Sequence, residues 1–315
     1  MVEHEVHVDA DGGRLSGTLC LPAEEGLCPV VLMIHGSGPL DRDENMKGQR
    51  LEVFNAVAHR LAKSGIASVR FDKRGCGSSQ GDYYAAGHHD FVDDVVCWYD
   101  WLRRARFCRP ESLFLLGHSE GCLVAAQTVV RRSGMAGLVL LCPFIEPMQD
   151  ILLRQAHQIE QELAARTGMG RLVNAFVAWF VGGPVASQRA LIRKLRTSTK
   201  ASIRVGFERV PAKWLRELLD VDASQVFGQI ACPMLIIGGE KDLQCDPADV
   251  SRIATLAHGA VDHHVIAGMT HVLRCDDQPA TLLGSGRLLA QPVEPELLEL
   301  VAEWVRSRTV SDAAS

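Results

Sequence analysis

The chain lacks the segments that would direct it into or across a membrane. Among its 315 residues, no apolar run approaches the roughly 18 residues of a membrane span. Residues 1–10 alternate acidic, histidine and valine side chains, without the basic, apolar and small-residue order of a signal peptide. The ten cysteines include no C-x-x-C pair and no zinc-type spacing, which favours reduced thiols. We therefore expect a cytoplasmic protein with no membrane partner and no metal site.

Strong charge of either sign is also missing. The formal net charge is −5 at pH 7, so the composition gives no reason to expect nucleic acid as a partner. Hydrophobic residues make up 47% of the chain, which is enough apolar material for a sizeable core. The length allows one large domain, or a core that carries an insertion.

What the chain does contain is a regular alternation of strands and helices. A hairpin is expected at the start, with a turn at residues 11–13. Buried apolar runs then alternate with helical segments, which predicts an α/β fold whose parallel sheet is covered on both faces. The expected strands are residues 5–10, 15–21, 30–34, 66–71, 113–116, 137–142, 234–238 and 261–266, and the expected helices are residues 51–63, 91–102, 122–130, 247–258 and 294–306.

Residues 144–228 interrupt this alternation. Helical patterns follow one another there, no convincing strand is visible, and several aromatic residues occur, among them Trp179 and Trp214. This stretch is therefore the candidate for an insertion into the α/β core. Its expected helices are residues 148–166, 171–181, 187–196 and 211–219.

The most informative stretch is a strand, a sharp turn and a helix around Ser119. Apolar residues 113–116 run into Gly117-His118-Ser119-Glu120-Gly121, and a small-residue helix follows. Such a turn lifts the serine hydroxyl clear of the sheet. It needs glycine on both sides because the backbone is strained and the helix passes close to the strand. The five residues alone can occur by chance around an idle serine, so the flanking strand and helix are what favour a nucleophile.

A serine nucleophile needs a base, and the base needs an acid that orients it. In this architecture the chain order is serine, acid, histidine, with each partner on a loop after a strand. Asp242 follows the strand at 234–238, and His271 follows the strand at 261–266. We therefore predict a catalytic triad of Ser119, Asp242 and His271.

Other histidines and acids compete for these roles. Two histidines begin a strand, at the wrong end of the sheet, and another lies inside the elbow and cannot turn back on the serine. A fourth ends a strand and is better placed to fix the loop after it. Among the acids, the one directly before Pro247 is typical of a helix cap. The competing histidines are His35, His118, His263 and His264, and the competing acids are Glu240, Asp246 and Asp249.

Acyl transfer also needs donors for the oxyanion. The backbone N–H of Glu120, just after the nucleophile, is one candidate, and the second should come from the loop after the strand at 30–34. Ser37 is the preferred residue there, with Gly38 as the alternative.

The same loop continues into Asp41-Arg42-Asp43, whose charges alternate. We expect a salt-linked loop near the mouth of the site. A direct contact of Asp41 and Arg42 with the substrate is the less favoured reading.

Together these segments resemble the α/β-hydrolase superfamily. The resemblance rests on residues 35–43, 70–75, 117–121, 239–242 and 268–271, and within the superfamily it is to bacterial serine esterases related to the prolyl-oligopeptidase and dienelactone hydrolase branches. It implies a mostly parallel, eight-stranded sheet and an inserted helical cap. The core would comprise residues 1–143 and 229–315, and the cap residues 144–228. We expect the cap to control substrate choice more than chemistry.

The predicted activity is hydrolysis of small-molecule carboxylic esters through an acyl-enzyme, without a metal or organic cofactor. A thioesterase or small peptidase would use the same residues and remains an alternative. A non-catalytic binding protein on a hydrolase fold is a third reading, although such proteins usually lose a triad member. The sequence does not indicate an oligomeric state.

Overall fold

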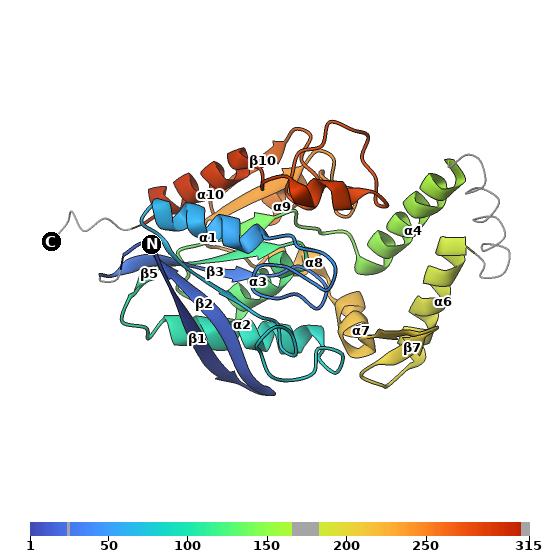
Figure 1. Ribbon diagram of the computed structural model, residues 1–315, viewed down its shortest axis with the longest axis horizontal. Helices are drawn as coiled ribbons and strands as arrows, with labels where there is room; N and C mark the ends of the chain where they lie inside the picture. Colours follow the sequence, from blue (N-terminus) through green and yellow to red (C-terminus); the bar gives the residue numbers. More distant parts are fainter. Residues whose placement is uncertain (24–25, 166–182, 310–315) are drawn as a thin grey trace.

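One mixed sheet forms the centre of the molecule (Figure 1). The computed structural model describes residues 1–23, 26–165 and 183–309, and within them eight strands follow the order β1-β2-β4-β3-β5-β6-β9-β10. Strand β2 is antiparallel to both of its neighbours, and the other neighbouring strands are parallel. This confirms the predicted α/β class and the eight-stranded, mostly parallel sheet. The strands are β1 Val2–Ala10, β2 Gly13–Leu21, β3 Cys28–Ile34, β4 Ala67–Phe71, β5 Cys108–His118, β6 Gly137–Leu141, β9 Met234–Gly239 and β10 Val261–Ile266.

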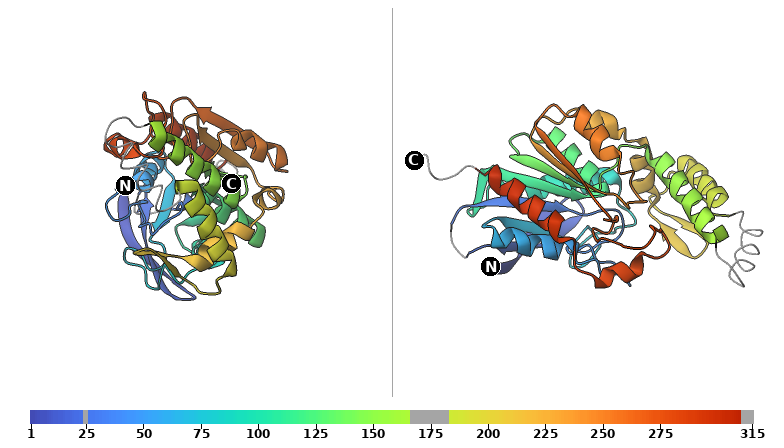
Figure 2. Two further views of the ribbon diagram at one scale, coloured as in Figure 1. Left: turned by 90° about the vertical axis from the view of Figure 1, so that its right-hand side faces the viewer. Right: turned by 90° about the horizontal axis from the view of Figure 1, so that it is seen from above.

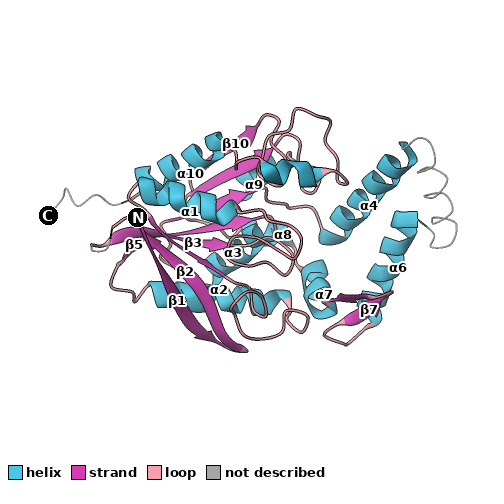
Figure 3. Ribbon diagram, viewed as in Figure 1, coloured by secondary structure: helices cyan, strands magenta, loops and turns pink. Residues whose placement is uncertain are grey.

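Helices cover both faces of the sheet (Figures 1 and 3). Apolar side chains of α1 and α10 pack on one face, and those of α2, α3, α8 and α9 pack on the other. Central strands such as β5 are therefore buried on both sides, which explains why they read as continuous apolar runs. The helices are α1 Val53–Lys63, α2 His88–Leu102, α3 Glu120–Arg131, α8 Ala223–Phe227, α9 Asp249–Leu256 and α10 Pro295–Ser307, with a 3₁₀ helix at Ser285–Ala290.

The stretch between β6 and α8 projects beyond the end of the sheet (Figure 2). Its described part contains the helices α4 (Met148–Ala165), α6 (Gly183–Thr197) and α7 (Ala212–Asp220), close to the predicted ranges. The expectation that no strand occurs here is wrong, because β7 (Ile203–Val205) and β8 (Glu208–Val210) form a small antiparallel hairpin. The helix expected at 171–181, including Trp179, lies outside the described residues. No helix in the described ranges is both long and apolar enough to cross a membrane.

Candidate active site

The turn around Ser119 has the geometry that the sequence predicts. Strand β5 ends at His118 and helix α3 begins at Glu120, so Ser119 is the single residue between them. Its φ of 54° and ψ of −121° are a strained conformation for a residue with a side chain. A Cβ on Gly117 would collide with the carbonyl of Gly121, and one on Gly121 would collide with the carbonyl of Ile34. The two glycines therefore let strand, turn and helix pack closely enough to form the elbow.

His271 and Asp242 are brought together by the loops after β10 and β9. The His271 Nδ1 lies 2.8 Å from Asp242 Oδ2. The other carboxylate oxygen of Asp242 accepts the backbone N–H groups of Gln244 and Cys245, at 2.8 and 2.9 Å. Burial opposes ionisation of Asp242, but the charge of His271 and these hydrogen bonds outweigh it, so the pKa of Asp242 is lowered. An ionised, fixed carboxylate thus holds the imidazole by one nitrogen.

The competing acids are engaged elsewhere. The Glu240 carboxylate accepts the backbone N–H of Gly268, and that of Asp249 accepts the backbone N–H of Ile145. The interpretation of Asp246 as a helix cap needs correction, because α9 begins only at Asp249 and its N-cap is Ala248. The Asp246 carboxylate instead accepts the Ala248 N–H at 3.0 Å, within the turn that precedes the helix.

The competing histidines also have other positions. His263 and His264 are exposed on β10, and the His35 ring bonds the backbone carbonyl of Phe71. The His118 ring makes a hydrogen bond to the backbone carbonyl of His271, at 3.0 Å, rather than to the serine. Among the candidate histidines, His271 is the one whose ring is bonded to a candidate acid, Asp242.

The loop after β3 lies against the N-terminus of α3. Ser37 Oγ donates a hydrogen bond of 3.0 Å to the Glu120 carboxylate, and the backbone carbonyl of Gly36 accepts one from Lys73. The N–H of Glu120 belongs to the first turn of α3, where backbone donors have no acceptor within the helix. Ser37 and Glu120, the two predicted oxyanion donors, are therefore neighbours.

The Glu120 side chain has a role that the sequence did not reveal. It is only 1% exposed, and it accepts hydrogen bonds from Ser37 Oγ, His88 Nδ1 and Trp214 Nε1, while Lys73 Nζ lies 3.8 Å away. Burial opposes ionisation, but the Lys73 charge and the hydrogen bonds lower the pKa of Glu120 to about 2. The carboxylate therefore links the loop after β3 to α2 and α7. The one sign of this role in the sequence is that Glu120, an acidic residue, lies inside the elbow.

A second buried pair, Glu44 and His118, was also missed. Glu44 is fully buried and has a φ of 63°. Its carboxylate accepts the backbone N–H of Gly36 at 2.8 Å and lies 2.8 Å from His118 Nδ1. Nothing in the sequence spacing connects these residues, because 74 positions separate the acid from the histidine.

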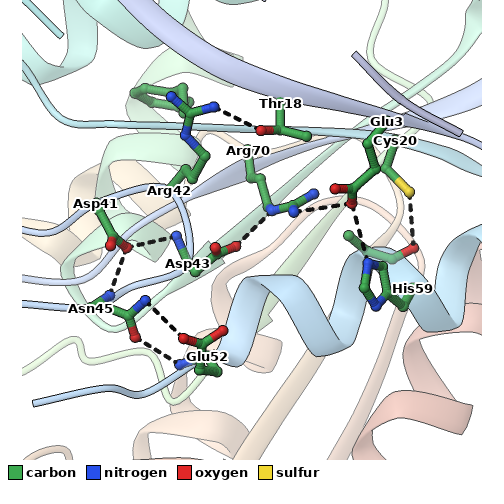
Figure 4. A network of polar contacts seen from close by, with 12 residues as sticks. Glu3, Thr18, Cys20, Asp41, Arg42, Asp43, Asn45, Glu52, His59 and Arg70 are labelled. Atoms are coloured by element: carbon green, nitrogen blue, oxygen red, sulfur yellow. Dashed lines mark hydrogen bonds and ion pairs between the residues drawn. The ribbon is translucent and has the colours of Figure 1, made fainter. Parts of the chain in front are cut away.

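The charged loop at Asp41-Arg42-Asp43 is salt-linked, as expected (Figure 4). The Arg42 guanidinium binds Asp72 at 2.7 Å and Glu5 at 2.6 Å, and the Asp43 carboxylate binds Arg70 at 2.6 Å. Asp41 accepts backbone N–H groups of its own loop. The described residues of this loop that line the cavity include Leu40, Glu44 and Met46, but neither Asp41 nor Arg42. A substrate-mouth role of Asp41 and Arg42 stays a prediction.

A cavity of about 530 Å³ opens at Ser119 and His271. Its walls come from the loop after β3, from helices α4, α6 and α7, and from the loop after β10. They are mostly apolar, with glutamine side chains among them. Its members include Leu40, Met46, Leu51, Phe144, Met148, Ile151, Leu152, Gln155, Gln188, Leu191, Trp214, Leu215, Leu282 and Leu289.

Thiols and imidazoles crowd around the acid–base pair. Ligand-type atoms of Asp242, Cys245 and His271 lie within 4.8 Å of one another, as do those of His118, Cys142 and His271. Burial, followed by the Asp242 charge, raises the pKa of both thiols well above the ordinary value, so they are protonated. The His271 Nδ1 is already bonded to Asp242. We therefore assign no metal to these groups.

Comparisons with known proteins identify the family to which the chain belongs. Residues 47–278 match the family described as "Serine aminopeptidase, S33". The chain is 23% identical to Esterase EstD of Thermotoga maritima over 235 residues, which are 75% of this chain and 52% of the relative. It thus spans about half of the length of this curated relative.

Solved structures show the same fold. Est1E from Butyrivibrio proteoclasticus has a TM-score of 0.59 at 17% identity, over 96% of each chain, and a second structure of it holds ferulic acid. The Pyrococcus furiosus esterase Pf2001 has a TM-score of 0.62 at 17% identity, over 97% of this chain and 91% of that one. Since the family match covers well over half of the chain, the protein belongs to the serine aminopeptidase S33 family of the α/β-hydrolase superfamily.

Proposed function

We propose that the protein hydrolyses neutral carboxylic esters through an acyl-enzyme formed on Ser119. One observation carries this proposal: the strained elbow presents Ser119 to the cavity that is also lined by His271, whose ring is held by Asp242. Relatives named as esterases, one of them with ferulic acid bound, support the same reaction class.

The proposed chemistry follows from the protonation that the hydrogen bonds require. Because the ionised Asp242 accepts the Nδ1–H of His271, the Nε2 lone pair is free to take the proton of the Ser119 hydroxyl. Ser119 Oγ then attacks the acyl carbon, and His271 returns the proton to the leaving alcohol. Water repeats the sequence on the acyl-enzyme, which releases the acid and restores the serine.

The developing oxyanion would be stabilised by the N–H groups of Ser37 and Glu120. The first N–H groups of α3 and the dipole of this 12-residue helix favour negative charge at that point. The bond from Ser37 Oγ to the Glu120 carboxylate keeps the two donors adjacent.

The charge of the cavity favours neutral esters over aminopeptidase substrates. Among the described residues that line it, Glu44 is the one carboxylate, and its oxygens are engaged by Gly36 and His118. Residues 166–182 contain no aspartate or glutamate. A substrate ammonium group would thus lose its hydration without gaining a carboxylate partner, which is costly.

We further propose that residues 144–228 act as a cap on a core formed by residues 1–143 and 229–315. Helices α4, α6 and α7 contribute Ile151, Leu191 and Trp214 to the cavity wall. These side chains are suited to an apolar acyl or alcohol group.

Substitution of the nucleophile tests the proposal. Ser119→Ala is expected to lower kcat on p-nitrophenyl esters by about 10⁴-fold or more while the melting temperature stays nearly unchanged. Ser133→Ala, an exposed serine, is the matched control. A fluorophosphonate probe should label the native protein and not the variant.

The substrate class is tested by comparing esters with thioesters and amino-acid p-nitroanilides of similar size. Full ester hydrolysis by the Ser119 variant would contradict the nucleophile assignment. A native preference for thioesters or for amino-acid anilides would contradict the ester assignment, and the latter would restore the aminopeptidase alternative.

A further inference from the structure

The His118 ring lies between two groups that accept hydrogen bonds. Its Nδ1 is 2.8 Å from a carboxylate oxygen of Glu44, and its Nε2 is 3.0 Å from the backbone carbonyl oxygen of His271. A carbonyl has no proton to give, and neither has an ionised carboxylate, so each ring nitrogen must donate. An imidazole that donates from both nitrogens is an imidazolium.

The other half of the Glu44 carboxylate supports this assignment. Its Oε1 accepts the backbone N–H of Gly36 at 2.8 Å, and the side chain is fully buried. A buried carboxylate that receives an N–H on one oxygen and an imidazole on the other is stabilised in its ionised form. Glu44 and His118 are thus a buried ion pair.

This pair connects the two loops on which catalysis would depend. Glu44 holds the peptide of Gly36, one residue before the oxyanion donor Ser37, and His118 holds the peptide of His271. His118 is also the residue directly before Ser119, and its ring lies 5.1 Å from the ring of His271. The nucleophile, the base and the oxyanion loop therefore share one network.

We propose, on the basis of the esterase function above, that Glu44 and the His118 imidazolium are positioning residues that fix the base loop relative to the oxyanion loop. Loss of the His118 proton would leave one of its two hydrogen bonds unmade and release one loop from the other. Activity should therefore fall at alkaline pH in a protein that is still folded.

The charged surroundings agree with a cationic ring. Glu44 and Asp242 face His118 with negative charge, whereas His271 is its imidazole neighbour and Cys142 lies close by as a thiol. Burial disfavours the charged ring, but the Glu44 charge and the hydrogen bonds to Glu44 and His271 outweigh it, and the pKa of His118 is raised. Among the described residues, the other titratable or charged groups that interact with the pair through Glu44 are His35, Lys73, Cys122 and Arg274.

Nuclear magnetic resonance tests the protonation state directly. Long-range ¹⁵N–¹H spectra of the ¹⁵N-labelled native protein at pH 7 should show both ring nitrogens of His118 protonated, with His118→Gln used to assign the signals. A neutral His118 ring at pH 7 would overturn the proposal.

Kinetics test the positioning role. Glu44→Gln removes the charge while its oxygen can still accept the Gly36 N–H, and we expect kcat and the rate of fluorophosphonate labelling to fall about 10- to 100-fold, with KM within about twofold. In His118→Gln the alkaline fall of the native rate should disappear. Asp94→Asn, which removes a buried carboxylate paired with Arg74 outside the cavity lining, is the matched control and should lower the melting temperature but keep the native pH profile.

The outcomes separate this proposal from the esterase function. If native protein hydrolyses esters and reacts with the probe, but both variants keep its rates and its alkaline limb, the positioning role is wrong. If native protein does neither, the proposed function is wrong and the positioning role falls with it. The ring spectrum decides the ion pair in either case.

Discussion

Three buried carboxylates next to Ser119 each face a different basic side chain. Asp242 faces His271, Glu44 faces His118, and Glu120 faces Lys73. Each carboxylate has a lowered pKa even though burial opposes its ionisation, because cations and N–H donors surround it. The acids can therefore hold neighbouring groups in place at neutral pH without serving as proton donors.

Exchange of Asp242, the proposed triad acid, gives the sharpest residue-level prediction. Asp242→Asn should keep the fold but lower kcat up to about 10⁴-fold, because an amide at this position favours the wrong tautomer of His271. Asp246→Asn should have little effect, since asparagine can also accept the Ala248 N–H. Both variants are measured on one activated ester; the reverse ranking would mean that the triad is assigned incorrectly.

Removal of the Glu120 charge should act mainly on stability. Glu120→Gln leaves Lys73 buried without its anion, which should lower the free energy of unfolding by about 3 kcal/mol at pH 7. A lowered pKa stabilises the fold above the unfolded value of 4.5, and this is lost as the pH falls toward about 2. Urea titrations at pH 7 and 3 should therefore show a smaller difference between native and variant at pH 3.

The surface pair of exposed Glu299 and half-buried Arg60 provides the comparison. Glu299→Gln should change stability little at either pH, because solvent screens such pairs. An equal loss in both variants would show that the burial of Glu120 carries no special weight.

The sequence predicted the residues that follow a positional rule and missed those that do not. The elbow, the chain order and the ends of the strands led to the prediction of Ser119, Asp242 and His271 as a triad, and the structure brings Asp242 and His271 into contact. Glu44 and His118 meet only because the loop after β3 folds back over the elbow. That contact is tertiary, and no local periodicity encodes it.

At the level of elements, the site lies where the parallel strands β5, β9 and β10 end, and the helices α4, α6 and α7 form part of the cavity wall. Trp214 of α7 lines the cavity, and its Nε1–H also donates a 2.6 Å hydrogen bond to the carboxylate of Glu120. A wall of the pocket is thus hydrogen-bonded to Glu120, the first residue of α3.

Substitution of Trp214 should change substrate preference. Trp214→Ala enlarges the cavity and is expected to shift the relative kcat/KM for short and long acyl esters by about 1–3 kcal/mol. Trp214→Phe keeps an aromatic ring but removes the bond to Glu120, so it separates pocket shape from hydrogen bonding. Trp101→Ala, partly buried on α2 against Trp98 and Phe107, is the control. A proportional loss on all esters would identify Trp214 as core packing. The parallel prediction for Trp179 remains a prediction.

The sequence did not predict strands that are short and exposed. Strands β7 and β8 have three residues each, mostly exposed, and meet at Gly206, whose φ is 58°. Such segments are too short for a period of two to be recognised. The long buried strands and amphipathic helices of the core were identified because their apolar patterns persist over many residues.

For the molecule as a whole, we expect the burial of His35 to lower stability at acid pH. His35, at the end of β3, is buried, and its Nε2–H donates to the carbonyl of Phe71 on β4. Burial, followed by the Lys73 charge, lowers the pKa of His35 to about 4. The unfolded chain therefore binds a proton at this residue more readily than the folded protein does.

The sign of this shift determines the last prediction. A depressed histidine pKa stabilises the fold fully above pH 6.5, and the contribution of about 3 kcal/mol is lost as the pH falls from 6.5 to about 4. The carboxylates with a lowered pKa lose their stabilising contribution only below about pH 4.5. The contribution from the raised pKa of His118 is instead lost as the pH rises above 6.5. His35→Gln can still donate to Phe71 but does not titrate, so its free energy of unfolding should fall less than that of the native protein between pH 6.5 and 4. Urea unfolding at several pH values in this window measures both slopes, and parallel slopes would show that another group controls acid unfolding.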